Sequence, residues 1–372
     1  MYIGFDAKRA FFNKTGLGNY SRNLISALHM YYPENHYQLF TPSIKEDMFF
    51  RSVEEWHNTE IIHPGQIWPI HLWRSFGVIG AFKKHKTEIY HGLSAELPLG
   101  NISKTTKTVV TIHDLIFKRF PELYAPIDRA IYFQKTKNAC HKANKIIAIS
   151  EQTKRDVVEF VGIDPNQIDV IYQVCDSIFE CSIKPEKKEQ IKKKYGLPHQ
   201  YLLSVGTLEF RKNALVILKA LLALPQEIKL VLVGKATTYI KVLENFIQKH
   251  ELKDRVVFLH NVAYLDLPGI YQMADIFIYP SIFEGFGIPI IEALKSKVPV
   301  IAATGSCLEE AGGPNSLYFN PNDEGQLITF IKHLLKDHPS KALQIEKSFE
   351  YANKFSYMQF AKDTMNLYRS IL

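Results

Sequence analysis

Short apolar runs rich in Val and Ile alternate with longer amphipathic stretches along most of this chain. The runs include residues 108–112, 145–149, 201–205, 229–233, 256–259, 275–279 and 298–302. Strands that helices cover on both faces of a parallel sheet are apolar at nearly every position in this way. Helical periodicity between them predicts helices at 20–31, 150–161, 213–223, 239–250 and 289–295. The alternation predicts an α/β, doubly wound fold.

The predicted strands are too many for one sheet of ordinary size, and 372 residues are enough for two domains. Strand character is lost at 174–180, a Lys- and Glu-rich stretch follows, and Gly196–Pro198 precedes a fresh strand. We therefore expect an N-terminal domain over 1–172 and a C-terminal domain over 173–354. Ligands of open α/β sheets bind beyond the carboxyl ends of the strands, so we expect the domains to face each other across a cleft.

The composition excludes several classes of protein. Hydrophobic residues make up 46% and charged residues 22%, which excludes a disordered chain. No uncharged apolar run approaches the ~18–20 residues that cross a bilayer, and the acid at Asp6 argues against a secretory signal. Because the cysteines lack C-x-x-C spacing, we expect free thiols in a reducing cytoplasm and no disulfide or metal role. They are Cys140, Cys175, Cys181 and Cys307.

The net charge of +7 has two interpretations. The protein is either a slightly basic enzyme or one attracted to anionic partners. The excess is spread along the chain, so we expect no nucleic-acid partner. The basic segment Lys83–Lys86 is either the face of a packed helix or a peripheral contact with anionic lipid at the inner face of the membrane. In the second case nearby aromatic residues would contribute: Trp68, Trp73, Phe76 and Phe82.

The segment Ser281–Leu294 follows a predicted buried strand and carries two carboxylates. Its glycines precede Pro289, a residue favoured at the first position of a helix. Glycines there let backbone N–H groups approach an anion, which the helix dipole also favours. Glu284 and Glu292 suit such a site only if they accept hydrogen bonds from hydroxyls. A sugar nucleotide offers both a diphosphate and hydroxyls; the alternative is a loop acid and a surface acid.

Arg211 and Lys212 follow the predicted strand 201–205 and stand at the predicted start of a helix, where the dipole disfavours cations. A bound anion explains both residues, because Arg grips phosphate in a fork and Lys acts as a point charge. Two solvated surface cations are the alternative. His113 closes the strand 108–112, either as a core histidine beside a local cap or as a group in a ligand site.

The glycines of Gly16–Gly18 are weak evidence by themselves. Ten residues separate them from Asp6, so they do not form the dinucleotide fingerprint, which needs a direct strand-to-helix turn. Asn19 or Ser21 would then simply cap the following helix.

Taken together, these segments resemble glycosyltransferase family 4, whose members carry a "glycosyl transferases group 1" C-terminal domain. Glu284–Glu292 resembles the Glu–seven residues–Glu signature of retaining glycosyltransferases with the GT-B fold. Further segments match in order and spacing over nearly the whole chain: Gly16–Tyr20, Thr111–Asp114, Ile149–Lys154, Ser204–Asn213 and Ala274–Ser281. One position departs, because Thr207 stands where some relatives carry an arginine.

The resemblance implies a retaining hexosyltransferase of cell-surface polysaccharide biosynthesis. Its donor would be a UDP-, GDP- or ADP-sugar and its acceptor a glycan or a lipid-linked glycan. Two Rossmann-like domains are implied, the first on the acceptor side and completed by an amphipathic helix at 355–372, the second binding the nucleotide sugar. The implied catalytic residues are His113, Arg211, Lys212 and Glu284. The implied donor-binding residues are Gly16, Gly18, Gly206, Val262, Gly285, Phe286, Gly287, Ile288 and Glu292.

No D-x-D sequence occurs in the chain, and the basic pair makes a metal unnecessary, so we expect no metal and no cofactor. Two other classes remain as alternatives. A phosphorylase of the same fold would need a cofactor-lysine motif that we do not find. A non-catalytic glycan-binding or scaffold subunit would need neither the two carboxylates nor the basic pair.

Overall fold

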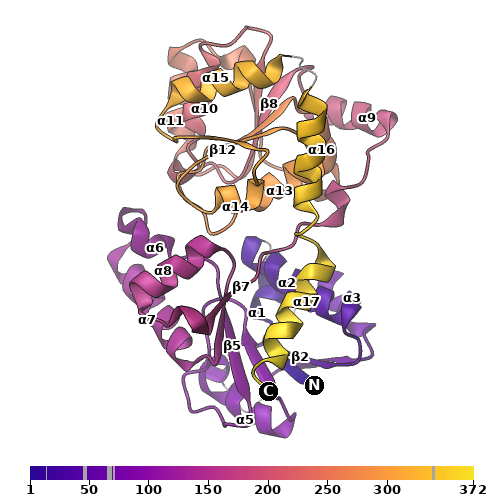
Figure 1. The fold of residues 1–372 in the computed structure, drawn as a ribbon, viewed down its shortest axis with the longest axis vertical. Helices are drawn as coiled ribbons and strands as arrows, with labels where there is room; N and C mark the ends of the chain where they lie inside the picture. Colours follow the sequence, from indigo (N-terminus) through magenta and orange to yellow (C-terminus); the bar gives the residue numbers. More distant parts are fainter. Residues whose placement is uncertain (14, 45–47, 65–68, 70–71, 337–339) are drawn as a thin grey trace. The chain divides into compact units, whose positions relative to one another are not determined.

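The computed structural model describes residues 1–13, 15–44, 48–64, 69, 72–336 and 340–372. Two units are present, one formed by Met1–Val174 with Tyr357–Leu372 and the other by Cys175–Ser356. Each unit is built on a parallel sheet flanked by helices, so the predicted α/β class with two Rossmann-like sheets is confirmed (Figure 1).

The first unit contains a seven-stranded sheet in the order β3-β2-β1-β4-β5-β6-β7. Its strands are β1 Tyr2–Asp6, β2 His36–Phe40, β3 Thr59–Ile62, β4 Ile89–Gly92, β5 Lys107–Ile112, β6 Lys145–Ala148 and β7 Ile168–Val170. Its helices include α1 Lys8–Phe12, α2 Gly16–Tyr31, α3 Met48–Glu54, α5 Val78–Lys84, α6 Ile116–Arg119, α7 Pro126–Lys142, α8 Glu151–Val161 and α17 Tyr357–Arg369.

The second unit contains a six-stranded sheet in the order β10-β9-β8-β11-β12-β13. Its strands are β8 Tyr201–Val205, β9 Lys229–Val233, β10 Val256–Leu259, β11 Ile276–Tyr279, β12 Val300–Ala303 and β13 Leu317–Phe319. Its helices include α9 Pro185–Tyr195, α10 Ala214–Leu221, α11 Ile240–Lys249, α12 Leu267–Gln272, α13 Ile288–Lys295, α14 Leu308–Gly312, α15 Glu324–Leu335 and α16 Ser340–Ala352.

The strand order of each sheet reverses at one point. In the first unit β1 pairs with both β2 and β4, and in the second β8 pairs with both β9 and β11. Consecutive helices then cover opposite faces of the sheet, which leaves a crevice beyond the carboxyl ends of the two strands at the reversal. Ligand sites are therefore expected after β1 and β4 in the first unit, and after β8 and β11 in the second.

Local sequence signals explain several helix ends. The Ser150 hydroxyl accepts a hydrogen bond from the Thr153 amide and caps α8, which ends at Gly162 with a φ of 76°. Helix α9 begins with Pro185 and ends at Gly196, whose φ is 61°. The hydroxyl of Ser150 thus satisfies an amide at a helix start, and the two glycines adopt the positive φ that ends a helix.

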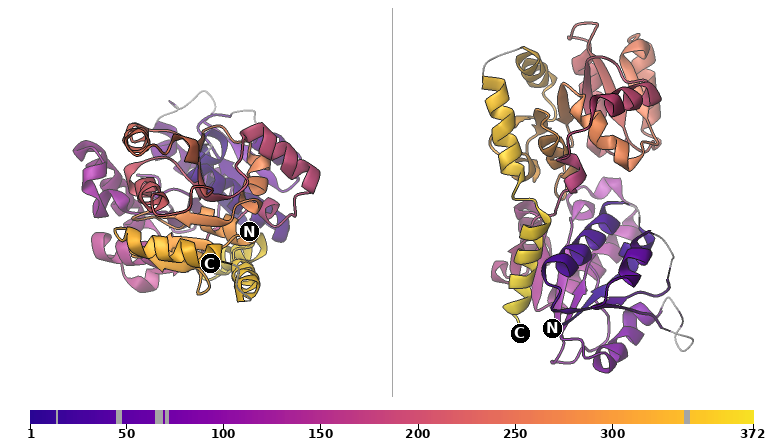
Figure 2. Two further views of the ribbon diagram at one scale, coloured as in Figure 1. Left: turned by 90° about the horizontal axis from the view of Figure 1, so that it is seen from above. Right: turned by 90° about the vertical axis from the view of Figure 1, so that its right-hand side faces the viewer.

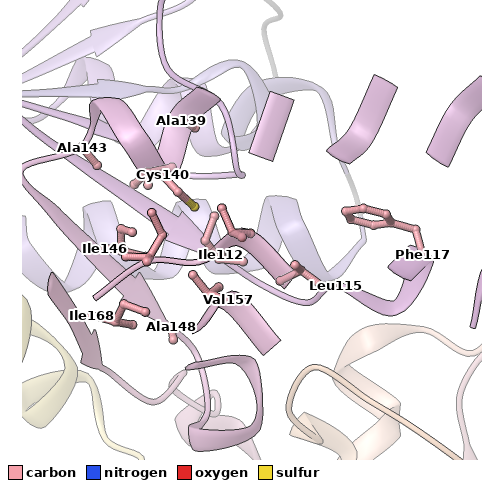
Figure 3. Close-up of a cluster of buried hydrophobic side chains, with 13 residues drawn as sticks. Ile112, Leu115, Phe117, Ala139, Cys140, Ala143, Ile146, Ala148, Val157 and Ile168 are labelled. Carbon is pink, nitrogen blue, oxygen red and sulfur yellow. The ribbon is translucent and has the colours of Figure 1, made fainter. Parts of the chain in front are cut away.

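The core of the first unit includes a cluster between the sheet and the helices α7 and α8. Figure 3 shows Ile112, Ile146 and Val157 at its centre, with the Cys140 thiol pointing into it. Phe117 lies at one end of this cluster in the same view. The cluster fixes the positions of α6 and α7 beyond the carboxyl end of β5.

The last helix, α17, packs on α2 and completes the first unit, and both chain ends lie at the same end of that unit (Figure 2). A buried chain of hydrogen bonds ties it to the sheet. Tyr368 Oη lies 2.6 Å from His91 Nδ1, and His91 Nε2 lies 2.8 Å from the hydroxyl of Thr111. The hydroxyl of Tyr20 on α2 lies 2.9 Å from the same Thr111 oxygen.

One expectation about local structure is wrong, and one of the two alternatives for the basic segment Lys83–Lys86 loses support. Gly16–Gly18 is the first turn of α2 rather than a loop, and no side chain caps this helix at Thr15.

The hypothesis that the segment around Lys83–Lys86 contacts lipid loses two of its aromatic residues. Trp73 and Phe82 are buried in a core cluster beside Phe40, because apolar residues on the inner face of α5 pack against the sheet. Phe76 is exposed, and Trp68 lies outside the described residues.

Candidate active site

Glu284 meets Arg211 and Lys212 beyond the strand reversal of the second sheet. The two cations stand in a short 3-10 turn, Phe210–Lys212, after β8, and Glu284 stands in the loop after β11. Lys212 Nζ lies 2.5 Å from Glu284 Oε1, and Arg211 Nη1 lies 2.9 Å from Oε2. The carboxylate is thus gripped on both oxygens, with 11% of its side chain exposed.

Two hydroxyl groups complete the surroundings of Glu284. The hydroxyl of Tyr279 donates to Oε1 at 3.2 Å and accepts from Lys212 Nζ at 2.6 Å. Ser281 also donates to Oε1. Burial alone would raise the pKa of Glu284, but Lys212 and Arg211 outweigh it and lower that pKa to about 2. Glu284 is therefore ionised at neutral pH.

The charges of this cluster are balanced. Arg211 also pairs with Glu209 at 2.6 Å, so two cations face two carboxylates. The pKa of Arg211 is raised, since the carboxylates outweigh its burial. An incoming anion does not find bare cations here. Hydrogen bonds already fix the positions of Arg211 and Lys212, which lowers the entropy cost of binding an anion.

Backbone glycines bring the neighbouring strand ends close together. Gly206 and Gly234 follow β8 and β9 with φ values of 152° and 155°. A Cβ at Gly234 would lie 1.9 Å from the carbonyl oxygen of Gly206, and Lys212 lies over Gly206. Only glycine fits Gly234, because the two loops meet backbone to backbone.

The loop that carries Glu284 is held in place by α14. Gly287 has a φ of 140°, and a Cβ there would lie 3.2 Å from Leu308 and 3.3 Å from Ala311. The buried thiol of Cys307 donates to the carbonyl oxygens of Glu284 and Phe286, at 3.1 and 2.8 Å. Gly285 and Ile288 therefore lie in a loop and first helical turn of fixed shape, and no side chain of the described residues caps α13 at Gly287.

Glu292 lies in a different environment from Glu284. It stands on α13, and its Oε2 accepts a hydrogen bond of 2.8 Å from the Tyr271 hydroxyl rather than from a cation. Burial, and secondarily the nearby Asp176 carboxylate, raise its pKa to about 7. The two carboxylates thus differ chemically: two cations lower the pKa of Glu284, whereas burial raises the pKa of Glu292.

The remaining implied residue of the second unit, Val262, is half-buried in the loop after β10. His260 in the same loop hydrogen-bonds the Gly234 carbonyl at 2.9 Å. Val262 therefore belongs to the same carboxyl edge of the sheet as Gly206.

His113 belongs to the first unit and follows β5. Its Nε2 lies 2.9 Å from the Leu93 carbonyl oxygen, and its ring meets the edge of Tyr20 at 4.6 Å between centroids. Burial, with a smaller contribution from the Arg9 cation, lowers the pKa of His113 to about 4, although the hydrogen bond to Leu93 acts in the opposite direction. The neutral ring must donate from Nε2, since a carbonyl oxygen only accepts, so Nδ1 is the acceptor nitrogen. Asp114, which precedes the N-cap residue of α6, accepts a hydrogen bond from the Ile116 amide at 3.1 Å.

Gly16 and Gly18 differ in what they contribute. A Cβ at Gly18 would lie 1.8 Å from the Asn13 carbonyl oxygen, whereas nothing lies within 4 Å of one at Gly16. Ser21 and Asn19 do not cap α2. Ser21 donates back to the Leu17 carbonyl, as a hydroxyl within a helix does.

Several site residues escaped the sequence analysis, among them Tyr271, Tyr279, Ser281 and Cys307. Tyr279 was readable only as the last residue of a buried strand, and Cys307 only as an isolated thiol. Among the described residues there is no group of three His, Cys, Asp or Glu side chains that would hold a metal ion.

Comparison with solved structures identifies the fold of this chain. The solved structure of Anabaena HepE in complex with UDP has a TM-score of 0.75 over 99% of both chains at 18% identity. The structure of WaaG, a glycosyltransferase involved in lipopolysaccharide biosynthesis, has a TM-score of 0.72 over 99% of both chains at 16% identity. At these identities the likeness shows the fold, which is that of the GT-B glycosyltransferases.

The family follows from the sequence comparisons. The family model described as Glycosyl transferases group 1 matches residues 185–351, and the model described as Glycosyltransferase Family 4 matches residues 15–177. O-antigen chain mannosyltransferase B of Escherichia coli is 30% identical over 295 residues, covering 78% of this chain and 76% of the relative. The O-antigen chain mannosyltransferase RfbU of Salmonella typhimurium is 30% identical over 226 residues, 60% of each chain. The chain belongs to glycosyltransferase family 4.

Proposed function

We propose that this glycosyltransferase moves a hexose, with retention of the anomeric configuration, from a nucleoside-diphosphate sugar to a glycan or lipid-linked acceptor in cell-surface polysaccharide biosynthesis. The observation that carries the proposal is the ion cluster of Arg211, Lys212 and Glu284 at the reversal of the second sheet. It combines fixed cations for a diphosphate with a carboxylate for hydroxyls. The O-antigen mannosyltransferases among its relatives make mannose the first sugar to test.

In the proposed reaction the bond between the anomeric carbon and the diphosphate oxygen breaks, and the acceptor hydroxyl oxygen bonds to the same face of that carbon. The hydroxyl proton passes to the departing diphosphate. Arg211 and Lys212 stabilise the negative charge that develops on this leaving group. Glu284, held ionised, accepts hydrogen bonds from hydroxyls of the donor sugar. Glu292 does the same for the ribose when it is ionised.

His113 has a positioning role in this proposal. Because its ring is neutral, its Nδ1 accepts rather than donates, which suits a substrate hydroxyl and not an oxyanion. We propose that the reaction needs no metal ion, because the cation pair already stands where the leaving-group charge develops. Unchanged activity in excess EDTA supports this, and activity restored only by a divalent ion overturns it.

The test is nucleotide release from UDP-, GDP- and ADP-linked sugars, beginning with the mannosyl donors, followed by NMR of the product's anomeric configuration. Release with one donor and retention in the product support the proposal. Inversion would overturn the retaining mechanism alone. Absence of release with every donor and acceptor extract, from protein that binds nucleotide, would instead favour a non-catalytic glycan-binding subunit.

We also propose a cytoplasmic location with peripheral contact to anionic membrane. In the part of the chain that the structure describes, no helix combines the length and apolarity needed to span a bilayer. Lys83, Lys84 and Lys86 are exposed at the end of α5, and the exposed Phe76 lies two residues before this helix begins. Flotation with anionic but not neutral vesicles supports the contact, and no flotation overturns it.

A further inference from the structure

A polar pocket of about 430 Å³ lies at the amino edge of the first sheet, where β5 and β6 begin. Its volume falls within the ~300–1,000 Å³ range of ligand sites. It is bounded by residues 100–104, by the first residues of β5 and by the end of α7. The two ends of β5 lie roughly 17 Å apart at the rise of a parallel strand. The pocket is therefore separate from His113 and from the carboxyl edge of this sheet.

The lining of this pocket is cationic. Lys104, Lys107 and Lys142 contribute to it, and none of the described lining residues is an Asp or a Glu. Within the described part of the chain, these three lysines form no ion pair with a carboxylate. Lys145 on β6 differs, because it pairs with Asp169 at 3.0 Å. Three uncompensated positive charges around one cavity favour an anionic ligand.

Uncharged donors add to this preference. Asn101 is exposed, and among the described residues neither its side chain nor its backbone N–H has a hydrogen-bond partner. Asn144 is also exposed, and its Oδ1 is occupied by the amide and the hydroxyl of Thr108, at 2.8 and 3.2 Å. Its Nδ2 therefore remains for a ligand. Phosphate oxygens accept from all of these groups, and charge-assisted hydrogen bonds are roughly twice as strong as neutral ones.

Lys142 has a second effect on the pocket. Its Nζ donates to the carbonyl oxygens of Pro98 and Gly100, at 3.2 and 3.3 Å, and to that of Leu99. These hydrogen bonds occupy the carbonyl acceptors on that side and fix the course of the chain. At Gly100 a Cβ would lie 2.7 Å from Ile79 Cδ1, so the segment also packs closely on α5. The rim is thus positioned before a ligand arrives, and less loop freedom is lost on binding.

The rest of the lining suits a sugar. The exposed hydroxyl of Ser103 lies 2.8 Å from that of Thr105, and a hydroxyl both donates and accepts. Ile102 is half-buried against the core cluster that contains Phe82, and it also lines the pocket. An apolar side chain beside hydroxyl and amide groups matches a sugar ring, whose C–H face is apolar and whose edge is polar. The ligand is therefore larger than an inorganic ion.

We propose that this pocket binds a saccharide that carries a phosphate group. The phosphate lies among Lys104, Lys107 and Lys142, and the sugar ring lies over Ile102 beside Asn101. A phosphate monoester carries about −1.5 to −2 charge at pH 7, which matches several lysines better than the single charge of a carboxylate. The inference goes beyond the proposed function, because the ligand is held at the amino edge of the sheet and is not transformed.

The first test is calorimetric titration of the whole protein with mannose 6-phosphate, with mannose as the uncharged probe. Mannose is expected to bind about tenfold more weakly or worse. The double variant K104Q/K107Q should weaken the phosphate probe by about tenfold or more, as loss of charge-assisted hydrogen bonds does. The matched control is K137Q/K347Q, which removes two exposed lysines outside the pocket and should bind normally. Equal binding by both double variants, or no binding by wild type, overturns the proposal.

A charge reversal tests the pocket more sharply. Asn101→Asp places a carboxylate among the lysines with almost no change in size, so binding of mannose 6-phosphate should fall below detection. Asn322→Asp makes the same change at an exposed position of the second unit and is the control. The same titration is run on Lys212→Ala, because the proposed donor site also attracts phosphate. Binding that is lost in Lys212→Ala but kept in K104Q/K107Q overturns the proposal.

Further arms identify the source of the phosphate. Equal affinity for inorganic phosphate and mannose 6-phosphate overturns the saccharide. So does flotation with phosphatidylglycerol vesicles that requires Lys104 and Lys107, when mannose 6-phosphate does not bind, since the group is then a lipid headgroup. Nucleotide release from donor sugars plays no part in these titrations. Their failure leaves the proposed function intact, and failure of sugar transfer leaves this site intact.

Discussion

Lys212 Nζ lies 2.5 Å from Glu284 Oε1, although the two residues are 72 positions apart in sequence and follow different strands. Strands β8 and β11 are neighbours in the sheet, so their carboxyl ends deliver these side chains to one place. In the proposed function, this is the place where the diphosphate and the sugar of the donor meet. Its consequences are testable one residue at a time.

Glu284→Gln should lower the turnover of sugar transfer by about 100-fold or more, as loss of a preorganised electrostatic contact does. It should not weaken nucleoside-diphosphate binding, because it releases Lys212 and Arg211 from a competing carboxylate. Steady-state kinetics and calorimetry on the same protein measure both effects. The control is Glu209→Gln, which removes the more exposed carboxylate beside Arg211. Equal losses in both variants would contradict a special role for Glu284.

Glu292 predicts a pH dependence of stability. Burial and then Asp176 raise its pKa to about 7 from the ordinary value of 4.5, so the folded protein binds this proton more tightly than the unfolded chain. The stabilisation is therefore present below about pH 4.5 and is lost as pH rises through 7. Glu292→Gln should flatten this part of the Tm profile between pH 5 and 8. Glu346→Gln, at an exposed ion pair, should leave the profile as in the wild type.

The same titration predicts how nucleotide affinity changes with pH. In the proposed function, an ionised Glu292 accepts hydrogen bonds from ribose hydroxyls, while the protonated form accepts less well. Affinity for a nucleoside diphosphate should rise as pH increases through about 7, and the rise should disappear in Glu292→Gln. A rise that persists in this variant would assign the titration to another group, such as the nucleotide's own phosphate.

Gly234→Ala should lower the free energy of unfolding by about 1–3 kcal/mol, as overpacking does. The added methyl would lie 1.9 Å from the Gly206 carbonyl oxygen, at a φ that alanine disfavours. Nucleotide binding should weaken as well, since Gly206 lies under Lys212. Gly80→Ala is the control, because nothing lies within 4 Å of a Cβ there and alanine favours the α5 helix. Denaturant titration measures the free energy of unfolding of both variants. Equal values for Gly234→Ala and Gly80→Ala would contradict the close backbone contact at Gly234.

The cysteines predict a simple labelling result. Cys181 is exposed, while the other three are buried, and burial raises the pKa of Cys140 to about 12. A thiol reagent should therefore react quickly with one thiol per native chain and with four after denaturation. Fast reaction of a second thiol would show that α14 or the core cluster opens more readily than the packing implies.

Much of the fold was readable from the sequence. The largely apolar run 229–233 predicts a strand with the bounds that the structure has, because a strand buried on both faces tolerates few polar residues. Shorter or more polar strands were not singled out. His36–Phe40 contains two polar residues, His36 and Gln38, and Leu317–Phe319 has only three residues, too few for periodicity to be informative.

The candidate site was readable in part. The sequence predicted that Glu284, Arg211 and Lys212 act together, and the structure brings them into contact. It did not reveal that Tyr279 lies between them, because strand order is a tertiary property. The contacts of Cys307 with the Glu284 loop were missed for the same reason. For Lys83–Lys86 the sequence left open a packed helix and a lipid contact, and the burial of Trp73 and Phe82 favours the packed helix.

The most direct measurement of the central claim is calorimetric titration of Lys212→Ala with nucleoside diphosphates. Loss of a charge-assisted hydrogen bond of ~1.5–3 kcal/mol predicts roughly 10- to 100-fold weaker binding than wild type. The matched control is Lys219→Ala, an exposed lysine on α10, which should bind normally. The account predicts that the loss applies to the diphosphate and not to the free nucleoside. Unchanged diphosphate affinity in Lys212→Ala, with the fold intact, would contradict it.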